Sequence, residues 1–192
     1  PEKKQSKDSN MYFDKFPKIP YDSVGQGDFK VVTNILRRTG ILEKAKANTL
    51  LFDTYDVKDG ETPEALADKM YDDPELHWVI LSVNNITDRY HQWPMATSQF
   101  LQYVNDKYDD PNGTHHYEQA QTSGDTSVKI NVYSNSALYT GDLDFYNSST
   151  IVTNIEYEQS VQNELRKIRL LDPQYVEQYV EEHEALIKES AI

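Results

Sequence analysis

The clearest pattern of hydrophobic and polar positions lies between residues 48 and 93. Residues 48–57 alternate apolar and polar side chains, which is typical of a β-strand. Gly60 follows, at a turn that a Cβ atom would obstruct. Residues 62–71 then carry apolar side chains at helical spacing, behind a threonine N-cap and a proline at the first helical position. The pattern predicts a strand that turns directly into a helix.

A second helix is predicted to start at residues 73–74, where an Asp-Pro pair repeats the start signal. Residues 75–85, ELHWVILSVNN, are apolar on nearly every side, and a helix of that kind must be covered by more than one neighbour. Asn84 or Asn85 can take the left-handed conformation that ends helices, and Ile86 returns to the core. We therefore expect a compact strand–helix–helix–strand module.

The segments before this module are harder to place. Residues 1–10 are polar and without periodicity, which predicts disorder, and we leave open whether the chain starts at Met11. Residues 11–22 alternate apolar side chains but contain two prolines, so we expect an extended arm that cannot be a central strand. Residues 29–38 fit a short helix or two turns, with Gly40 as the stop.

After the module the pattern predicts a helix and then a β-hairpin. Thr97 or Ser98 is a suitable N-cap for a helix that ends near residue 108. Residues 115–121 and 127–134 alternate as the strands of a hairpin do, with the intervening residues 122–126 as its loop. The expected apolar face of the helix consists of Phe100, Leu101, Val104 and Tyr108.

The C-terminal part of the chain is expected to be a polar segment followed by helix, strand and helix. Residues 134–152 are polar and irregular, which predicts a long loop or a second arm. Residues 152–165 fit a helix, and residues 166–171 alternate charge with apolar side chains as an exposed strand would. Residues 173–189 follow a proline start with sustained helical spacing.

These elements predict an α+β fold in four parts. The parts are an extended N-terminal arm (1–28), the two-helix module with flanking helices (29–108), the β-hairpin with its irregular loop (109–152), and a C-terminal helical and strand segment (153–192).

The composition predicts that parts of the chain depend on partner proteins for their order. Of 192 residues only 38% are hydrophobic, so the chain can bury a small core and leaves segments that need a neighbour. The absence of cysteine excludes disulfides and thiolate metal sites. A net charge of −13 disfavours nucleic acid as a partner, because phosphate binding needs clustered cations. No apolar run has the length of a membrane span, and no secretory signal is visible, which predicts no membrane partner and a cytosolic protein at synthesis.

The residues that could support chemistry do not form a recognisable site. His115, His116 and Glu118 are the nearest approach to a metal cluster, but adjacent histidines on a strand point to opposite faces. Residues 25–29 lack the Gly-Lys-Ser/Thr ending of a phosphate loop, and nothing marks a carboxylate cleft. We therefore expect no enzyme, no metal and no cofactor. The fourteen tyrosines suit either a protein interface or a half-buried core.

The two-helix module has a strand, a Gly-Glu-Thr turn, a helix that ends in tyrosine, a second helix and an Asn-containing closure. The positions that carry this arrangement are Tyr55, Val57, Gly60, Glu61, Thr62, Leu66, Ala67, Tyr71, Leu81, Asn84, Asn85 and Ile86. In these positions the module resembles the LysM pattern, which implies a βααβ fold that often binds N-acetylglucosamine polymers such as peptidoglycan. The chain departs from that pattern at DDPELHW between the helices and at TDRYHQWPM in place of the closing strand.

A longer motif runs from residue 63 to residue 95. Its positions are Pro63, Glu64, Leu66, Ala67, Tyr71, Asp73, Pro74, Leu76, Trp78, Val79, Ile80, Leu81, Asn84 and Trp93. With this motif the chain is similar to the baseplate wedge protein 53 family of T-even-type contractile-tailed phages (myoviruses). The resemblance extends to an N-terminal arm at 11–22 and a C-terminal strand and helix at 166–187, and so covers most of residues 11–190.

This resemblance implies a structural subunit of the tail baseplate that joins neighbouring wedges into the ring around the hub. The implied partners are other wedge subunits and neighbouring wedges, with hub proteins as a further candidate, at six copies or a multiple per baseplate. The implied location is the virion tail, after assembly in the host cytoplasm. The alternative function is a LysM-type module that binds peptidoglycan.

Aromatic and large apolar side chains of the arm, the second helix and the last helix are the expected partner contacts. Trp78 fits the core better than an interface, and Trp93 fits either. The predicted interface residues are Tyr12, Phe13, Phe16, Leu76, Trp78, Ile80, Trp93, Tyr175 and Tyr179.

Overall fold

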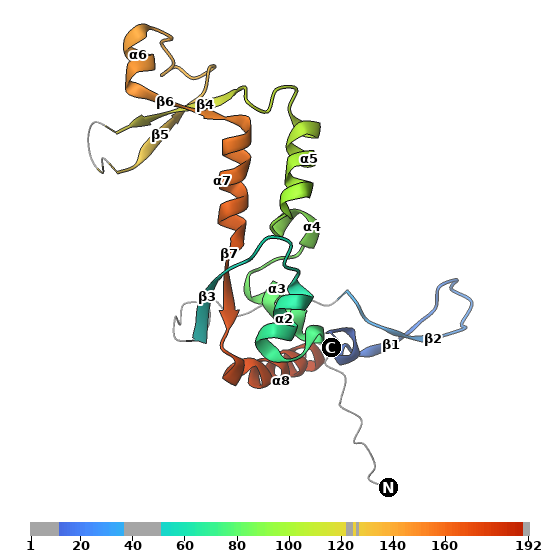
Figure 1. Ribbon diagram of the computed structural model, residues 1–192. Helices are drawn as coiled ribbons and strands as arrows, with labels where there is room; N and C mark the ends of the chain where they lie inside the picture. The colour runs from blue at the N-terminus through green and yellow to red at the C-terminus, as the bar shows by residue number, and fades with distance from the viewer. Residues whose placement is uncertain (1–11, 37–50, 122–124, 126, 190–192) are drawn as a thin grey trace. The chain divides into compact units, whose positions relative to one another are not determined.

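The structure is a computed structural model that describes residues 12–36, 51–121, 125 and 127–189 (Figure 1). The chain divides into two compact units, and each is described on its own. Unit 1 consists of Pro1–Trp93 and Lys167–Ile192, and unit 2 is Pro94–Arg166. The disorder predicted for residues 1–10 lies outside the described residues.

Unit 1 is built on a strand–helix–helix–strand arrangement whose last strand comes from the C-terminal part of the chain. Strand β3 (Phe52–Asp56) pairs antiparallel with β7 (Lys167–Leu171), with Phe52 opposite Leu171 and Asp56 opposite Lys167 (Figure 1). Between them in sequence come the two helical segments of the module. These are α2 (Pro63–Tyr71) and the η3–α3 pair (Pro74–Leu76 and His77–Val83). The predicted strand and both helices are therefore confirmed.

Local side-chain chemistry accounts for these boundaries. The Thr62 hydroxyl accepts the Ala65 N–H at 3.2 Å, and the Asp73 carboxylate accepts the Glu75 N–H at 2.9 Å, so both predicted N-caps are formed. Gly60 has a φ of 70°, as its turn requires, and Asn85 has a φ of 56° at the exit from α3. The sequence left Asn84 and Asn85 as alternatives for that exit, and the structure selects Asn85.

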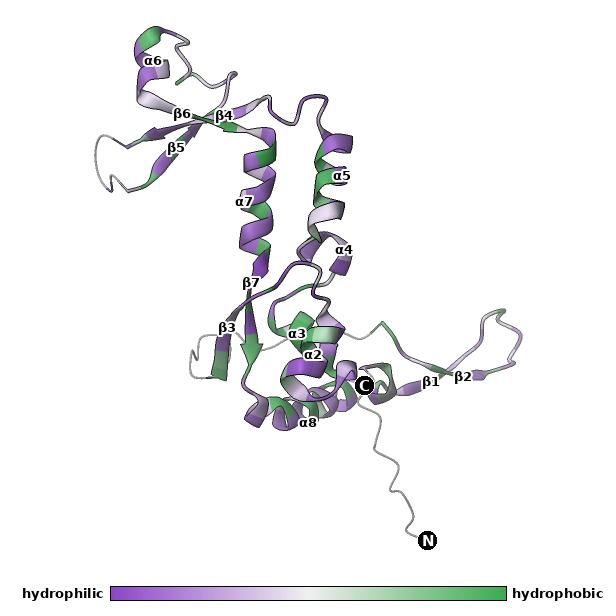
Figure 2. Cartoon of the chain, viewed as in Figure 1, coloured by the Kyte–Doolittle hydropathy of each residue, from purple (hydrophilic) through white to green (hydrophobic). Residues whose placement is uncertain are grey.

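Helix α3 is covered by other elements of its own chain, which supply the several neighbours that its apolar sequence predicted. Ile80 lies in a core with Leu66 of α2 and with Ile168 and Leu170 of β7. Trp78 lies in a second core formed with the last helix, α8 (Pro173–Glu189). Figure 2 shows the apolar colouring of α3 and of one face of α8. A helix that is apolar all round needs several neighbours, and here a distant part of the same sequence supplies them.

The alternation in β7 predicted an exposed strand, but only its basic residues Lys167 and Arg169 are exposed, and its apolar residues are buried. Ile168, Leu170 and Leu171 are each at most 5% exposed, because one face of β7 packs on α3 and the residue after the alternation turns toward α8. The helix predicted at 173–189 coincides with α8.

The N-terminal arm contains a β-hairpin that the sequence did not predict. Helical turn η1 (Tyr12–Lys15) is followed by β1 (Lys18–Tyr21) and β2 (Lys30–Thr33), which pair antiparallel. The helix or turns predicted at 29–38 are wrong for residues 30–33, because three consecutive β-branched residues in β2 favour a strand once β1 is beside it. Residues 35–36 form a turn, and residues 37–38 and the predicted stop at Gly40 lie outside the described residues. The arm agrees with the prediction that it has no central strand, because its sheet has only two strands, with Pro20 in β1 and Pro17 just before it.

Unit 2 combines a three-stranded sheet with two long helices. Helix α5 (Thr97–Lys107) starts after Ala96, which makes no side-chain cap, so the predicted caps Thr97 and Ser98 are wrong by one or two positions. The predicted hairpin is confirmed as β4 (Thr114–Ala120) and β5 (Lys129–Val132), while most of its loop lies outside the described residues. The sheet order is β5-β4-β6.

The predicted loop at 134–152 instead contains regular structure. Helix α6 (Leu143–Ser148) is capped by Asp142, whose carboxylate accepts the Phe145 N–H at 2.7 Å, and β6 (Ser149–Thr153) pairs with β4. Helix α7 (Asn154–Arg166) follows, and it confirms the helix predicted there. Polar composition hid these elements because β6 has an exposed face and α6 buries only Phe145.

The α+β class predicted from the sequence is confirmed. The structure groups the residues into two units, whereas the sequence suggested four consecutive parts. The difference has one physical cause: pairing of β3 with β7 joins the C-terminal segment to the module, while residues 94–166 form a compact unit of their own.

Candidate partner-binding surfaces

An aromatic cluster fixes the start of the arm to the core of unit 1. The Tyr12 ring lies 5.3 Å from that of Trp78, 5.5 Å from that of His183 and 4.8 Å from that of Phe16. Phe16 is only 4% exposed, whereas its neighbour Phe13 is 54% exposed. Ring pairs at these distances are favourable, so η1 is held in place and the rest of the arm continues from a fixed point.

The structure divides the predicted interface residues into three groups. Phe13 is exposed, and the half-buried members are Tyr12, Tyr175 and Tyr179. The buried members belong to the chain's own core, and their assignment to a partner interface stays a prediction that this burial does not support. They are Phe16, Leu76, Trp78, Ile80 and Trp93.

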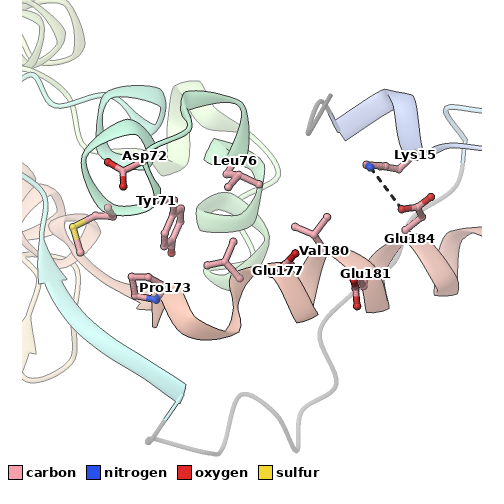
Figure 3. A pocket seen from close by; sticks show the side chains of 11 residues that line it. Lys15, Tyr71, Asp72, Leu76, Pro173, Glu177, Val180, Glu181 and Glu184 are labelled. Atoms are coloured by element: carbon pink, nitrogen blue, oxygen red, sulfur yellow. Dashed lines mark ion pairs between the residues drawn. The ribbon is translucent and has the colours of Figure 1, made fainter. Parts of the chain in front are cut away.

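An open groove of about 520 Å³ lies between α8 and the end of α2 (Figure 3). Its apolar floor includes Leu76, Val176 and Val180. Its rim carries the four carboxylates of Asp72, Glu177, Glu181 and Glu184.

Among the described residues that line the groove, Lys15 is the one with a cationic side chain. The Lys15 ammonium, on the arm, lies 3.6 Å from the Glu184 carboxylate, as the dashed line in Figure 3 marks. The other three acids of the rim, Asp72, Glu177 and Glu181, form no ion pair with a residue that lines the groove. An apolar floor with an acidic rim suits a partner segment that combines apolar and basic side chains.

A smaller hollow of about 230 Å³ lies on another side of α8 and is mostly apolar. It is lined by Leu51, Phe52, Val83, Leu171 and the tyrosines 175 and 179, among others. The Tyr179 hydroxyl is 2.8 Å from the Ser82 hydroxyl, which ties α8 to α3 at the floor of this hollow. Two of the predicted interface tyrosines therefore border a concave apolar surface.

Two motif residues prove to be structural supports between distant elements. The Asn84 amide donates to the Arg169 carbonyl and accepts the Arg169 N–H, both at 2.8 Å, so it serves as a partner for the edge of β7 that faces away from β3. The Tyr71 hydroxyl donates to the Leu171 carbonyl at 3.0 Å, and burial raises its pKa to about 12. Neither role was visible in the sequence, because the contacts join residues at least 85 positions apart.

The remaining titratable residues of unit 1 form no catalytic arrangement in the described chain. His183 is buried against Trp78 at 4.6 Å, and its Nδ1 has no hydrogen-bond partner among the described residues. Burial lowers the pKa of His183 below its ordinary 6.5, so the ring is neutral near pH 7. Glu61 accepts the Tyr55 hydroxyl at 3.0 Å and the Lys58 N–H at 3.1 Å, which is a turn-stabilising role.

In unit 2 the two adjacent histidines lie together, contrary to the prediction that they point to opposite faces. A register shift in β4 between Thr114 and His116 breaks the alternation and brings the two Nδ1 atoms within 2.8 Å. His115 also stacks on Tyr157 at 3.9 Å. Within the described ranges, no group of three or more metal-binding side chains comes together.

A buried carboxylate holds the two long helices of unit 2 together. Glu158 of α7 is 3% exposed and accepts hydrogen bonds from Lys107 and from the Tyr108 hydroxyl, each at 2.7 Å. Burial alone would raise the pKa of Glu158, but these two donors lower it, and the carboxylate raises the pKa of Lys107 in return. The pair is a structural clamp.

The polar side chains described above stabilise the chain's own fold, and the exposed features are an open groove and an arm rich in apolar side chains. This combination is typical of a protein that binds other proteins. The family described as Base plate wedge protein 53 matches residues 11–131, which is more than half of the chain. The chain belongs to this family of phage proteins.

A curated relative gives the same assignment. The chain is 35% identical over 60 residues to Baseplate wedge protein gp53 of Enterobacteria phage T4. The match spans 31% of this chain and 31% of the relative. None of the helices in the described chain combines the length and apolar character that crossing a membrane demands.

Proposed function

We propose that the chain is a structural subunit of a phage tail baseplate that joins neighbouring wedges into the ring around the hub by protein–protein contacts. Membership of the wedge protein family carries this proposal. A structural role also agrees with the described residues, whose polar groups serve caps, clamps and strand edges.

The arm and the acidic groove supply two surfaces for such contacts. Among the described residues, seventeen large apolar side chains are exposed, and eight of these lie between Phe13 and Leu36. Exposed apolar side chains concentrated in one short segment mark an interaction site. The proposed partners are other wedge subunits and neighbouring wedges, and the hub proteins, with six copies or a multiple per baseplate in the virion.

The test is complementation of a phage that lacks this gene, followed by electron cryomicroscopy of the tails. The wild-type chain is expected at the contacts between adjacent wedges. The informative variants change exposed residues, Phe13→Asp on the arm and Glu177→Lys on the groove, and each should lower the yield of closed baseplates. Tails in which the chain is missing, or contacts only one wedge, would refute wedge joining.

A matched control separates lost contacts from lost folding. Leu186→Asp changes a side chain of α8 that is 47% exposed and outside both grooves, so it should leave ring closure intact. Leu76→Asp, Trp78→Asp and Ile80→Asp are poor probes, because each places a charge in the core of unit 1.

The peptidoglycan-binding alternative makes a different prediction. A LysM-type function requires the purified chain to sediment with cell-wall sacculi. We expect no retention on sacculi, and retention that free N-acetylglucosamine oligomers abolish would favour the alternative.

A further inference from the structure

The β1–β2 hairpin has one closed edge and one open edge. Asn34 donates its backbone N–H to the Pro17 carbonyl at 2.9 Å, which continues the strand register by one pair. Hydrogen-bonded and non-hydrogen-bonded pairs alternate along an antiparallel ladder. The pairs Ile19–Val32 and Tyr21–Lys30 are therefore hydrogen-bonded, and Lys18–Thr33 and Pro20–Val31 are the pairs whose backbone groups point outward.

Proline closes the outer edge of β1. Pro20 occupies an outward-pointing position, where it has no N–H to offer to another strand. On the other strand, Val31 points both its N–H and its carbonyl outward, and Thr33 points its N–H outward. The Thr33 carbonyl already accepts the Ile35 N–H at 3.0 Å. Among the described residues no third strand pairs with β2.

The side chains at the open edge are apolar and basic. Val31 is 73% exposed and Phe29 is 64% exposed, although both are large apolar residues. The two strands contain Lys18 and Lys30 and no acidic residue. A two-stranded sheet is marginal alone and is stabilised by a third strand.

We propose that the outer edge of β2 binds an extended strand of another protein in the assembled baseplate and so becomes part of a three-stranded sheet. The occupant presents apolar side chains to Val31 and a carboxylate to Lys30, as charge complementarity requires. An extended strand suits these open backbone groups, because its own N–H and C=O groups repeat at the spacing of Val31 and Thr33. This inference rests on the proposed function for its setting and adds the chemistry of the contact.

The test measures amide hydrogen exchange residue by residue in the purified chain and in assembled tails. The Val31 and Thr33 amides should exchange freely in the purified chain and at least tenfold more slowly in the tail. The Ile19 and Val32 amides, which pair within the hairpin, serve as the internal reference. Equal exchange at Val31 in both samples would overturn the proposal, while the presence of the chain in the tail would leave its baseplate role standing.

A proline variant tests the same edge by removing one backbone N–H group from it. Val31→Pro removes an outward N–H and leaves the hairpin's own hydrogen bonds, so it should enter tails at least tenfold less well than Val31→Thr, which keeps the N–H. Protection of Ile19 and Val32 in the purified variant shows that the hairpin is intact. Equal incorporation of the two variants would contradict a strand at this edge.

A photo-crosslinker at residue 29 identifies the occupant. Crosslinks to an extended, acid-containing segment of a different baseplate protein support the proposal. Protection of Val31 that appears in the purified chain as its concentration rises, with crosslinks between copies, would overturn it in favour of a second copy of this chain.

Discussion

At the scale of single residues, His183 is buried as a neutral ring, and protonation at low pH destabilises the folded state. Its pKa is lowered by burial, so the unfolded chain binds a proton more readily than the folded chain below the ordinary pKa of 6.5. The stability that the neutral ring provides is therefore present above pH 6.5 and is lost as the pH falls from there toward the lower pKa of the folded state.

His183→Phe is expected to reduce the pH dependence of unfolding below pH 6.5. A single site accounts for at most about 1.4 kcal/mol per pH unit, and chemical denaturation at several pH values measures this slope. Leu186→Ala, on the same helix, removes no titratable group and should retain the wild-type slope. A slope unchanged in His183→Phe would show that the buried ring does not titrate on unfolding.

Asn84 is a second residue whose effect is local and measurable. Asn84→Ala removes both hydrogen bonds to Arg169, but these groups are near solvent, so water replaces part of the loss. We expect a decrease of about 1–2 kcal/mol in the free energy of unfolding. The matched variant Asn85→Gly should be neutral or stabilising, because Asn85 has a φ of 56°. Equal effects of the two variants would contradict the edge-pairing role of Asn84.

At the scale of elements, the β1–β2 hairpin depends on its loop. The Asp22 carboxylate accepts N–H groups of Val24 at 3.0 Å, Gly25 at 2.7 Å and Gly27 at 2.6 Å. These bonds, the one from Gly27 foremost, lower the pKa of Asp22 below its ordinary 3.8. The stability that these hydrogen bonds give to the loop is present above pH 3.8 and is lost as the pH falls through the lowered pKa of Asp22.

Asp22→Ala is expected to disorder the hairpin while unit 1 keeps its core. Backbone NMR should show Ile19 and Val32 moving toward random-coil shifts, with β3 and β7 unchanged. Asp28→Ala, in the same loop but without these hydrogen bonds, should leave the hairpin shifts in place. Persistence of the hairpin in Asp22→Ala would show that strand pairing alone maintains it.

Elements with strong local signals could be predicted from the sequence, and those that depend on distant partners could not. Helices α2 and α8 could be predicted from the proline at their first position and from the helical spacing of their apolar residues. Strand β2 could not be recognised, because three β-branched residues also fit a turn until β1 lies beside them. The wedge motif likewise gave the family, but it could not show that Trp78 and Ile80 face their own chain.

At the scale of the whole molecule, unit 1 is complete only with its C-terminal segment. Truncation after Arg166 removes β7 and α8, and so exposes the apolar α3. We expect unit 1 of the truncated chain to lose its hydrogen-exchange protection, while unit 2 keeps most of its own because the truncation leaves all of its residues in place. Leu186→Ala in the full chain is the matched control. Protection of α2 and α3 in the truncated chain would contradict this division.

The pairing of β3 with β7 has a consequence for synthesis on the ribosome. Val83 is translated 88 residues before Leu171, which at bacterial elongation rates is a delay of roughly 4–18 s. During that interval α3 has been synthesised, but the strand and the helix that cover it have not. The nascent chain therefore passes through a stage at which a chaperone has an apolar helix to bind.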